Sequence, residues 1–334
     1  MKLLNITLIV PSNSDYEKLS LFFRNIMKWS RLPKEIILIQ TNKKKQLTNK
    51  FFINFCKKNN ILFKNFYKPN LYPGAARNIG IQNSTLKIIS FLDVGTHATN
   101  KWLQHGFEKI NKTNSLIVWG KTYYITNSKK EEIIRASTYG VKPINTLPGS
   151  IIDKKIFNIV GIFLNNIRSG EDAEWIYRVN MHNVLTCNSK EIIKYQNLKG
   201  VSYTSIIKKW FRNYCFSSKL SYLTANRDIY LLVFSFLIAL LAYNWNPIFA
   251  EWSHQSPFYI PHITKVSMMF IFLAYFFIRG FILPIKKGHD LKFLLPLSVF
   301  KITLLSLCID VTKLISFICA KFYIKYYENR NNTK

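Results

Sequence analysis

Residues 3 to about 200 alternate short apolar runs with segments of helical periodicity, and this alternation constrains the fold more than any other feature. The runs of strand character lie at 4–10, 35–40, 61–66, 86–93 and 115–120. The helical segments lie at 15–30, 46–58, 75–83 and 100–111. Strands separated by helices form βαβ units, so the pattern predicts an α/β domain with a mostly parallel, mixed sheet flanked by helices.

The composition changes after about residue 203 and indicates a membrane-associated region. Segment 204–224 mixes basic and aromatic side chains, as an amphipathic helix on an anionic bilayer surface would; an ordinary basic surface helix is the alternative. Residues 229–245 carry no charge and are long enough for a slightly short membrane span. Residues 263–285 form a second candidate span, although Arg279 lies inside it.

The third apolar segment, residues 293–322, has a polar stripe. Ser306, Asp310 and Lys313 are spaced by four and three residues, so they share one face of a helix. The segment is a third span with a buried polar stripe, an interfacial helix, or half of a helix hairpin, and the sequence leaves these alternatives open.

The charges of the connecting loops predict an orientation in the membrane. Residues 246–262 contain no Lys or Arg, whereas residues 286–292 contain three Lys, which places the second loop in the cytoplasm. The N-terminal domain then lies at the cytoplasmic face of a bacterial-type inner (plasma) membrane. Along the chain, the predicted organisation is an α/β domain at 1–203, an amphipathic interfacial helix at 204–224, two or three membrane or interfacial helices at 225–322 and a polar tail at 323–334.

The net charge of +30 fits an anionic partner or the codon bias of an AT-rich genome. Because the Lys residues are scattered, with no Arg/Gly tract and no zinc-finger spacing, sequence-specific nucleic-acid binding is excluded and membrane attraction remains. The five Cys residues form no CxxC pair, which predicts reduced thiols and a cytoplasmic soluble part. The opening MKLLNITLIV predicts a first strand rather than a signal peptide.

Three short segments carry residues suited to chemistry. PGAARNIG at 73–80 opens a helix beside an arginine, which favours a phosphate-bearing ligand or, alternatively, a tight structural turn. Asp93 ends an apolar run, where an acid commonly holds a ribose hydroxyl or a divalent metal, or caps the next helix. GEDAEWIYR at 170–178 holds three of the 17 acids of the chain, which suits a general base in a cleft or a favourable helix dipole.

In this order, the segments resemble the inverting family 2 glycosyltransferases of the GT-A fold. That family has an opening strand with a Pro-x-Asn-like turn, a G-x-A-R-N-x-G segment, an Asp-x-Asp at a strand end and a later Glu-Asp pair. The matching residues here are Pro11, Ser12, Asn13, Gly74, Ala76, Arg77, Asn78, Gly80, Asp93, Glu171 and Asp172. LPGSIIDKKIFNIVGIF at 147–163 is similar to the approach to the acidic pair in the family, and the likeness covers roughly residues 4–200.

The resemblance implies displacement at an anomeric carbon with a nucleotide-sugar as the donor. It assigns the general base to Asp172. The residues that it assigns to the donor are Pro11, Asn13, Gln40, Asn42, Arg77, Asn78 and Asp93, with Asp93 also as the metal ligand. The residues that are assigned to the acceptor are Gly149, Ser150, Glu171 and Trp175, with Trp175 as a platform for stacking a sugar.

The sequence departs from the family pattern on the donor side. Gly95 replaces the second acid of Asp-x-Asp, and the neighbourhood of a further histidine ligand offers Tyr195 and Gln196 instead. Gln40 to Asn42 replace the acid that binds the base. A weakened Mn²⁺ or Mg²⁺ site is therefore expected, with Arg77 or Lys199 sharing the charge of the leaving group, or with His97 as a late substitute ligand.

The function implied is transfer of a sugar to a lipid-linked or glycan acceptor, in the synthesis of a surface polysaccharide or glycolipid. A lipid-linked acceptor explains why the enzyme carries its own membrane segments. The alternative is a catalytically inactive GT-A-like membrane scaffold or binding protein, which would tolerate loss of Asp172.

Overall fold

The computed structural model describes residues 3–42, 46–220 and 227–332. Contacts within the chain divide it into two compact units. The sheet unit comprises Met1–Asn127, Lys142–Gly200 and Ile324–Lys334. The helical unit comprises Ser128–Val141 and Val201–Tyr323.

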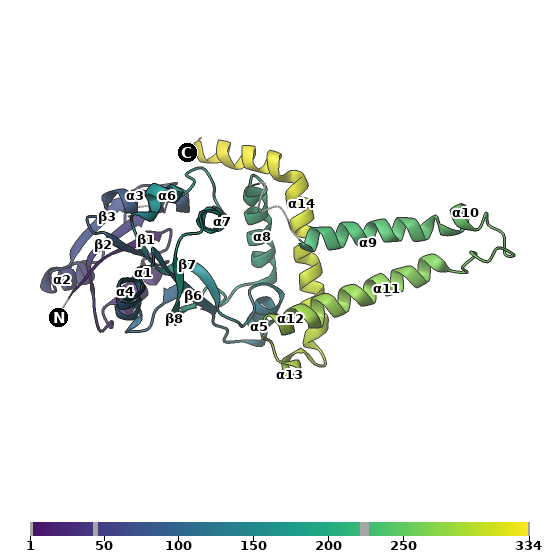
Figure 1. Cartoon of the computed structure of the whole chain (residues 1–334), viewed down its shortest axis with the longest axis horizontal. Coiled ribbons are helices and arrows are strands. Elements are labelled where there is room, and N and C mark those ends of the chain that lie inside the picture. The colour runs from purple at the N-terminus through teal and green to yellow at the C-terminus, as the bar shows by residue number, and fades with distance from the viewer. Residues whose placement is uncertain (1–2, 43–45, 221–226, 333–334) are drawn as a thin grey trace. The chain divides into compact units, whose positions relative to one another are not determined.

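The sheet unit is built on one eight-stranded mixed sheet (Figure 1). Its strands are β1 (Leu4–Ser12), β2 (Pro33–Gln40), β3 (Leu62–Tyr67), β4 (Ile88–Phe91), β5 (Thr96–His97), β6 (Ile117–Tyr124), β7 (Ile144–Asp153) and β8 (Thr186–Tyr195). The order across the sheet is β3-β2-β1-β4-β7-β6-β8-β5. Strands β3, β2, β1 and β4 are parallel, whereas β7 runs antiparallel to both β4 and β6. The predicted α/β class with a mixed sheet is confirmed.

Helices cover both faces of this sheet. They are α1 (Tyr16–Ile26), α2 (Lys50–Lys58), α3 (Pro73–Asn83), α4 (Trp102–Thr113), α6 (Ile156–Val160) and α7 (Glu171–Met181). In β1, Ile6, Leu8 and Val10 enter the core beneath α1, α2 and α4, while Ile9 enters the core beneath α3, α6 and α7. Side chains on both faces of the strand are apolar because helices cover both faces. Burial of this apolar surface stabilises the fold on each side of the sheet.

The register of the sheet brings several loops to one edge. Ile9 of β1 pairs with Ile37 of β2 and with Phe91 of β4, so the carboxyl ends of these parallel strands lie side by side. This is the edge at which open α/β sheets bind ligands. Helix α3 starts nearby with Pro73 in its first turn, where proline lacks only an N–H that has no partner within the helix.

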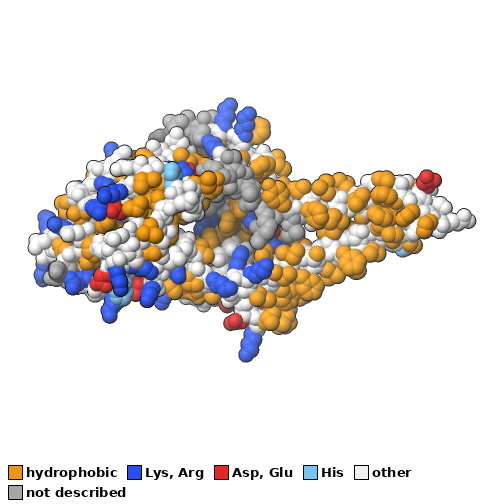
Figure 2. Space-filling view, viewed as in Figure 1, with side chains coloured by type: hydrophobic (Ala, Val, Ile, Leu, Met, Phe, Trp, Pro, Cys, Tyr) orange, Lys and Arg blue, Asp and Glu red, His pale blue; other side chains and the backbone are white. Residues whose placement is uncertain are grey.

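The helical unit contains α5 (Lys129–Ser137), α8 (Tyr203–Ser217), α9 (Arg227–Tyr243), α10 (Trp245–Phe249), α11 (Ile263–Phe277), the π-helical turn η2 (Ile278–Ile282), α12 (Leu283–Lys286), α13 (Leu291–Leu294) and, as far as Tyr323, α14 (Ser298–Asn332). Helices α9 and α11 lie side by side, and hydrophobic side chains cover much of this pair (Figures 1 and 2). Two helices, Ile263–Lys286 and Ser298–Tyr326, are long and apolar enough to cross a membrane. The apolar part of α9 is shorter, at Leu232–Tyr243.

The predicted polar stripe of the third segment is buried. Asp310 of α14 is fully buried and accepts hydrogen bonds from Arg279 of η2, at 2.5 Å, and from Tyr275 of α11, at 2.8 Å. Lys313 lies 3.4 Å from the same carboxylate. Two cations and a phenol thus pair with the acid and link the two long apolar helices. This pairing explains how the apolar helix α14 can bury the charge of Asp310.

The predicted interfacial helix lies partly outside the described residues, which omit 221–226. In its described part, α8, the aromatic side chains have protein neighbours in the helical unit. The Trp210 ring stacks on Tyr139 at 6.1 Å between centroids, and the Phe211 ring meets Tyr323 edge-on at 5.1 Å. The apolar side of α8 is therefore covered at least partly by protein.

Candidate active site

A buried ion pair joins the two strongest sequence motifs. Arg77 of α3 and Glu171 of α7 have only 4% and 5% of their surfaces exposed, and Arg77 Nη1 donates to Glu171 Oε1 at 2.7 Å. Burial alone would lower the pKa of Arg77, but the charges of Glu171, Asp93 and Asp172 outweigh this effect and raise it. The arginine is permanently cationic and holds the first turn of α7 against α3.

Asp93 lies beside the same arginine and is held by a tyrosine. Arg77 Nη2 lies 3.7 Å from Asp93 Oδ1, and the Tyr195 hydroxyl donates to Asp93 Oδ2 at 2.5 Å. Burial and the charge of Asp93 raise the pKa of Tyr195 well above its ordinary value, so the phenol keeps the proton that it donates. We name Arg77, Asp93, Glu171 and Tyr195 the carboxylate cluster.

The end of β8 packs against the chain around Gly95. Thr96 pairs with Tyr195 in the sheet, and the Gln196 N–H donates to the Gly95 carbonyl at 3.1 Å. A Cβ atom at position 95 would lie 2.1 Å from Asn197 Oδ1. The carboxamide of Asn197 thus occupies the space that a second acid would need.

These surroundings do not fit a divalent cation. Mg²⁺ and Mn²⁺ need several deprotonated oxygen ligands, but the two oxygens of Asp93 face a phenol O–H and a guanidinium. Among the described residues, no group of three or more His, Cys, Asp and Glu side chains could hold a metal. His97 is exposed on β5, where its Nε2 lies 3.5 Å from Asn25 Nδ2, rather than beside Asp93 as a substitute ligand.

Asp172 opens α7 next to the cluster, in a different environment from Glu171. Gly170 precedes the helix with a φ of 93°, which favours glycine, and the acids of the first turn suit the positive end of the helix dipole. Asp172 is half-buried, and among the described residues its carboxylate accepts a hydrogen bond only from the Ala173 N–H, at 2.8 Å. It is the carboxylate of the Glu-Asp pair that remains available to a ligand.

Several residues predicted to contact the acceptor have their side chains engaged inside the protein. Trp175 is fully buried, and its indole N–H donates to the Gly161 carbonyl, so it presents no face to a sugar. Ser150 is fully buried in β7, where its hydroxyl bonds to Gly120 N and Thr146 O, and the adjacent Gly149 is buried as well.

Two residues predicted to contact the donor are engaged inside the protein in the same way. Gln40 is fully buried and pairs with the Leu47 backbone through both ends of its carboxamide. Asn78 is 3% exposed and clamps the Phe163 backbone in the same two-ended way. Arg77 is 4% exposed, and its guanidinium lies within 4 Å of the carboxylates of Asp93 and Glu171.

The remaining predicted donor residues lie at the strand ends. Pro11 is half-buried near the end of β1, and Asn13 is exposed just after it. Asn42 follows β2, and its Oδ1 atom is buried without a hydrogen-bond partner among the described residues. Asn42 therefore offers an acceptor at the edge where contact with a nucleotide base is predicted.

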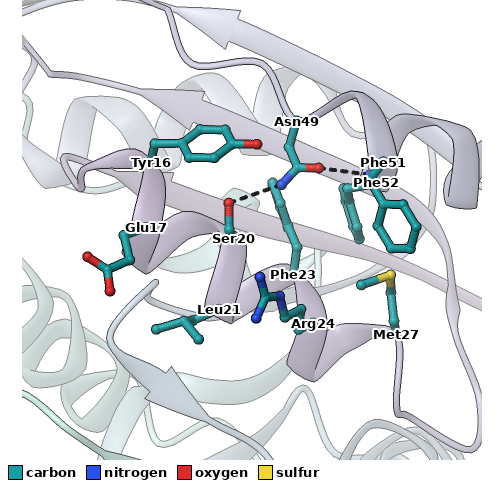
Figure 3. A pocket seen from close by; sticks show the side chains of 10 residues that line it. All are labelled: Tyr16, Glu17, Ser20, Leu21, Phe23, Arg24, Met27, Asn49, Phe51 and Phe52. Atoms are coloured by element: carbon teal, nitrogen blue, oxygen red, sulfur yellow. Dashed lines mark hydrogen bonds between the residues drawn. The ribbon is translucent and has the colours of Figure 1, made fainter.

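A further pocket of the sheet unit lies elsewhere. A cavity of about 580 Å³ between α1 and α2 is lined by Phe51, Leu21 and Tyr16 among others, and Asn49 bridges its wall by a hydrogen bond to Ser20 (Figure 3). Its helices cover the face of the sheet opposite to α3 and α7. It contains none of the predicted site residues.

Comparison with known proteins agrees with the arrangement of these motifs. Residues 7–168 match the model of Glycosyl transferase family 2, so the match ends just before the Glu-Asp pair. An uncharacterized glycosyltransferase from Rickettsia bellii (strain RML369-C) is 28% identical over 170 residues, which cover 48% of this chain but only 24% of that protein.

Solved structures with a distant likeness come from S. aureus. TarS 1-349 in complex with UDP aligns with a TM-score of 0.44 and 14% identity, over 63% of this chain and 64% of that chain. TarS 1-349 in complex with UDP-GlcNAc aligns with a TM-score of 0.43 and 11% identity, over 90% of both chains. By its family match, with motifs in the expected order, the domain that begins with β1 is a member of glycosyl transferase family 2.

Proposed function

We propose that this protein transfers a sugar from a nucleotide-sugar to the hydroxyl of a lipid-linked saccharide, with inversion at the anomeric carbon. The observation that carries the proposal is the available Asp172 carboxylate next to the buried Arg77–Glu171 pair, within a domain of family 2. The product would enter a surface polysaccharide or glycolipid made at the cytoplasmic face of a bacterial-type inner membrane.

In this mechanism Asp172 is the general base. The acceptor oxygen attacks the anomeric carbon from the face opposite to the leaving group, the bond to the nucleoside diphosphate breaks, and the hydroxyl proton passes to the Asp172 carboxylate. Glu171 is unsuited to this role because it is 5% exposed and bound to Arg77. Arg77 instead fixes the first turn of α7, which positions Asp172.

The leaving group requires positive charge at the edge where Asp93 lies. Because both oxygens of Asp93 have protein partners, we propose that Asp93 orients the ribose and that protein cations serve the diphosphate. Lys199 is the candidate, since it is exposed and follows Tyr195 by four residues.

This arrangement predicts nucleotide binding that does not depend on metal. The affinity for nucleoside diphosphates, measured by calorimetry, is expected to change by less than about threefold between Mn²⁺, Mg²⁺ and chelator, because one carboxylate that is already hydrogen-bonded adds little metal affinity. A loss of binding of about tenfold or more in chelator would show that a cation completes the site.

The exposed apolar surface of α9 and α11 supports membrane attachment. We expect the full chain to stay with the membrane fraction through washes with high salt and alkaline carbonate, and to be released by detergent, because burial of this surface in lipid is not screened by salt. Release by salt alone would mean that the basic charge, rather than the apolar helices, attaches the protein.

The function is tested with detergent-purified protein, a panel of nucleotide-sugars and membrane lipid extract. Mass spectrometry is expected to find a lipid that gains the mass of one sugar, and the proton coupling at the new anomeric carbon should report a configuration opposite to that of the donor. Retention of the donor configuration would exclude the single displacement with Asp172 as its base.

A further inference from the structure

A second pocket, of about 470 Å³, lies along helix α3 within the sheet unit. Its walls are one side of α3, the residues that lead into that helix, and the loop that leads toward Asp172. We name it the carboxamide pocket after the side chains at its rim, which are Asn70, Gln82, Asn165 and Asn166. Its volume falls within the range of about 300–1,000 Å³ that is typical of sites for small ligands.

The walls of this pocket are fixed by hydrogen bonds and close packing. Asn78 donates to the Phe163 carbonyl at 2.8 Å and accepts from the Phe163 N–H at 3.0 Å, and it also donates to Asn165 Oδ1 at 2.7 Å. One turn earlier in α3, a Cβ atom at Gly74 would lie 2.2 Å from the Leu164 carbonyl oxygen. Helix and loop are therefore held at one separation, and the pocket is preformed.

The lining of the pocket favours a neutral ligand with many hydroxyl groups. Of the residues that line it, none is charged, although 19% of the residues in the chain are. The carboxamides at the rim are exposed, and each offers both donors and acceptors, as sugar hydroxyls require. Ile79, Ile162 and the ring of Tyr72 supply the apolar surface that the C–H faces of a sugar ring can cover.

The loop of the pocket is linked to the first turn of α7 through α3. The same position in α3, Gly74, faces both the Leu164 carbonyl of the pocket loop and the side chain of Glu171, whose Cγ atom would lie 3.4 Å from its added Cβ. Glu171 is the immediate neighbour of Asp172. The loop of the pocket and the first turn of α7 therefore pack against the same position at the start of α3.

We propose that the carboxamide pocket binds an uncharged saccharide portion of the acceptor and so selects the acceptor of the transfer. The donor is a poorer occupant, because it carries two phosphates and this pocket offers them no cation. The proposal rests on the proposed function, since it concerns the acceptor of that reaction.

The test measures saccharide binding separately from transfer. Full-length protein in detergent is titrated with neutral mono- to tetrasaccharides and with glucuronic acid, and binding is followed by saturation-transfer NMR. Gln82→Ala and Asn166→Ala are each expected to weaken the binding of a neutral saccharide about five- to tenfold, the range for one lost hydrogen bond. Asn83→Ala is the matched control, because Asn83 is exposed on the same helix but does not line the pocket.

The possible results distinguish failure of the pocket proposal from failure of the proposed transferase function. Neutral saccharides that bind the parent and the Asn83→Ala variant better than the two pocket variants support the pocket, even if no donor is ever turned over. Absence of neutral saccharide binding, or equal binding by all variants, overturns the pocket proposal even if transfer activity is found. If transfer is measured, the two pocket variants should raise the KM for the acceptor and leave the KM for the donor unchanged.

Discussion

Asp172→Asn is expected to lower the kcat of sugar transfer about 100- to 10,000-fold while donor affinity stays nearly constant. Asparagine keeps the size of the side chain and the acceptor for the Ala173 N–H, but it cannot take the proton of the attacking hydroxyl. The variant therefore removes the base without rearranging the first turn of α7. Transfer rates at saturating donor and calorimetric donor affinity are the two measurements required.

The control for this variant is Glu17→Gln, which neutralises an exposed carboxylate on α1. It should leave kcat within about twofold of the parent, as expected for a surface substitution far from the reacting groups. A kcat for Asp172→Asn within about threefold of the parent would remove Asp172 from the role of base. Since Glu171 is buried against Arg77, the base would then have to come from another part of the chain.

Arg77→Met is expected to have the largest effect on the stability of the sheet unit. The substitution leaves the Glu171 carboxylate buried at 5% exposure without its cation, a change that typically costs about 3–5 kcal/mol. For a domain of this size the midpoint of thermal unfolding should fall by roughly 10 °C. Circular dichroism or intrinsic fluorescence of the detergent-solubilised chain measures this shift.

A double variant distinguishes the stability lost by leaving a buried charge unpaired from the stability lost by poorer packing. Arg77→Met with Glu171→Gln removes the unpaired charge, so it should recover a substantial part of the lost stability. Arg24→Met, at an exposed arginine of α1, should shift the midpoint by less than about 2 °C. If Arg77→Met and Arg24→Met unfold at the same temperature, the Arg77–Glu171 pair does not hold α3 against α7.

The sequence predicted the parallel half of the sheet well because local pattern determines it. The apolar runs at 4–10 and 35–40 became β1 and β2, and the helix expected at 75–83 became α3, two residues longer at its start. The antiparallel strand β7 was harder to predict, because it takes in the Pro-Gly-Ser stretch that reads locally as a turn. Its pairing with β4 and β6 depends on contacts between residues far apart in the sequence, not on local pattern.

In the site, too, the residues that belong to local motifs were predictable, whereas a contact between residues far apart in the sequence was not. Asp93, Arg77 and the Glu-Asp pair were identified from their motifs, and the structure brings Arg77 within 4 Å of both Asp93 and Glu171. The role of Tyr195 could not be predicted, because its partner Asp93 lies 102 residues away in the sequence. The signal that was available was a tyrosine where the family often has a histidine.

Burial explains why several residues identified by motif have side chains engaged inside the protein. Trp175, Ser150 and Gln40 stand at positions suited to a ligand by motif, but each is fully buried and bonded to backbone. A sequence motif gives the residue type and the neighbourhood but not the direction of the side chain. Conversely, the rim of the carboxamide pocket has no motif, because its members come from three separate stretches of chain.

The most direct measurement is the release of nucleoside diphosphate from a panel of nucleotide-sugars by the full chain with membrane lipid extract, beside Asp172→Asn. We predict release that depends on the lipid extract, that persists in chelator and that is lost in the variant. Equal rates for the parent and Asp172→Asn, or no release from any donor, would contradict a transferase that uses Asp172 as its base.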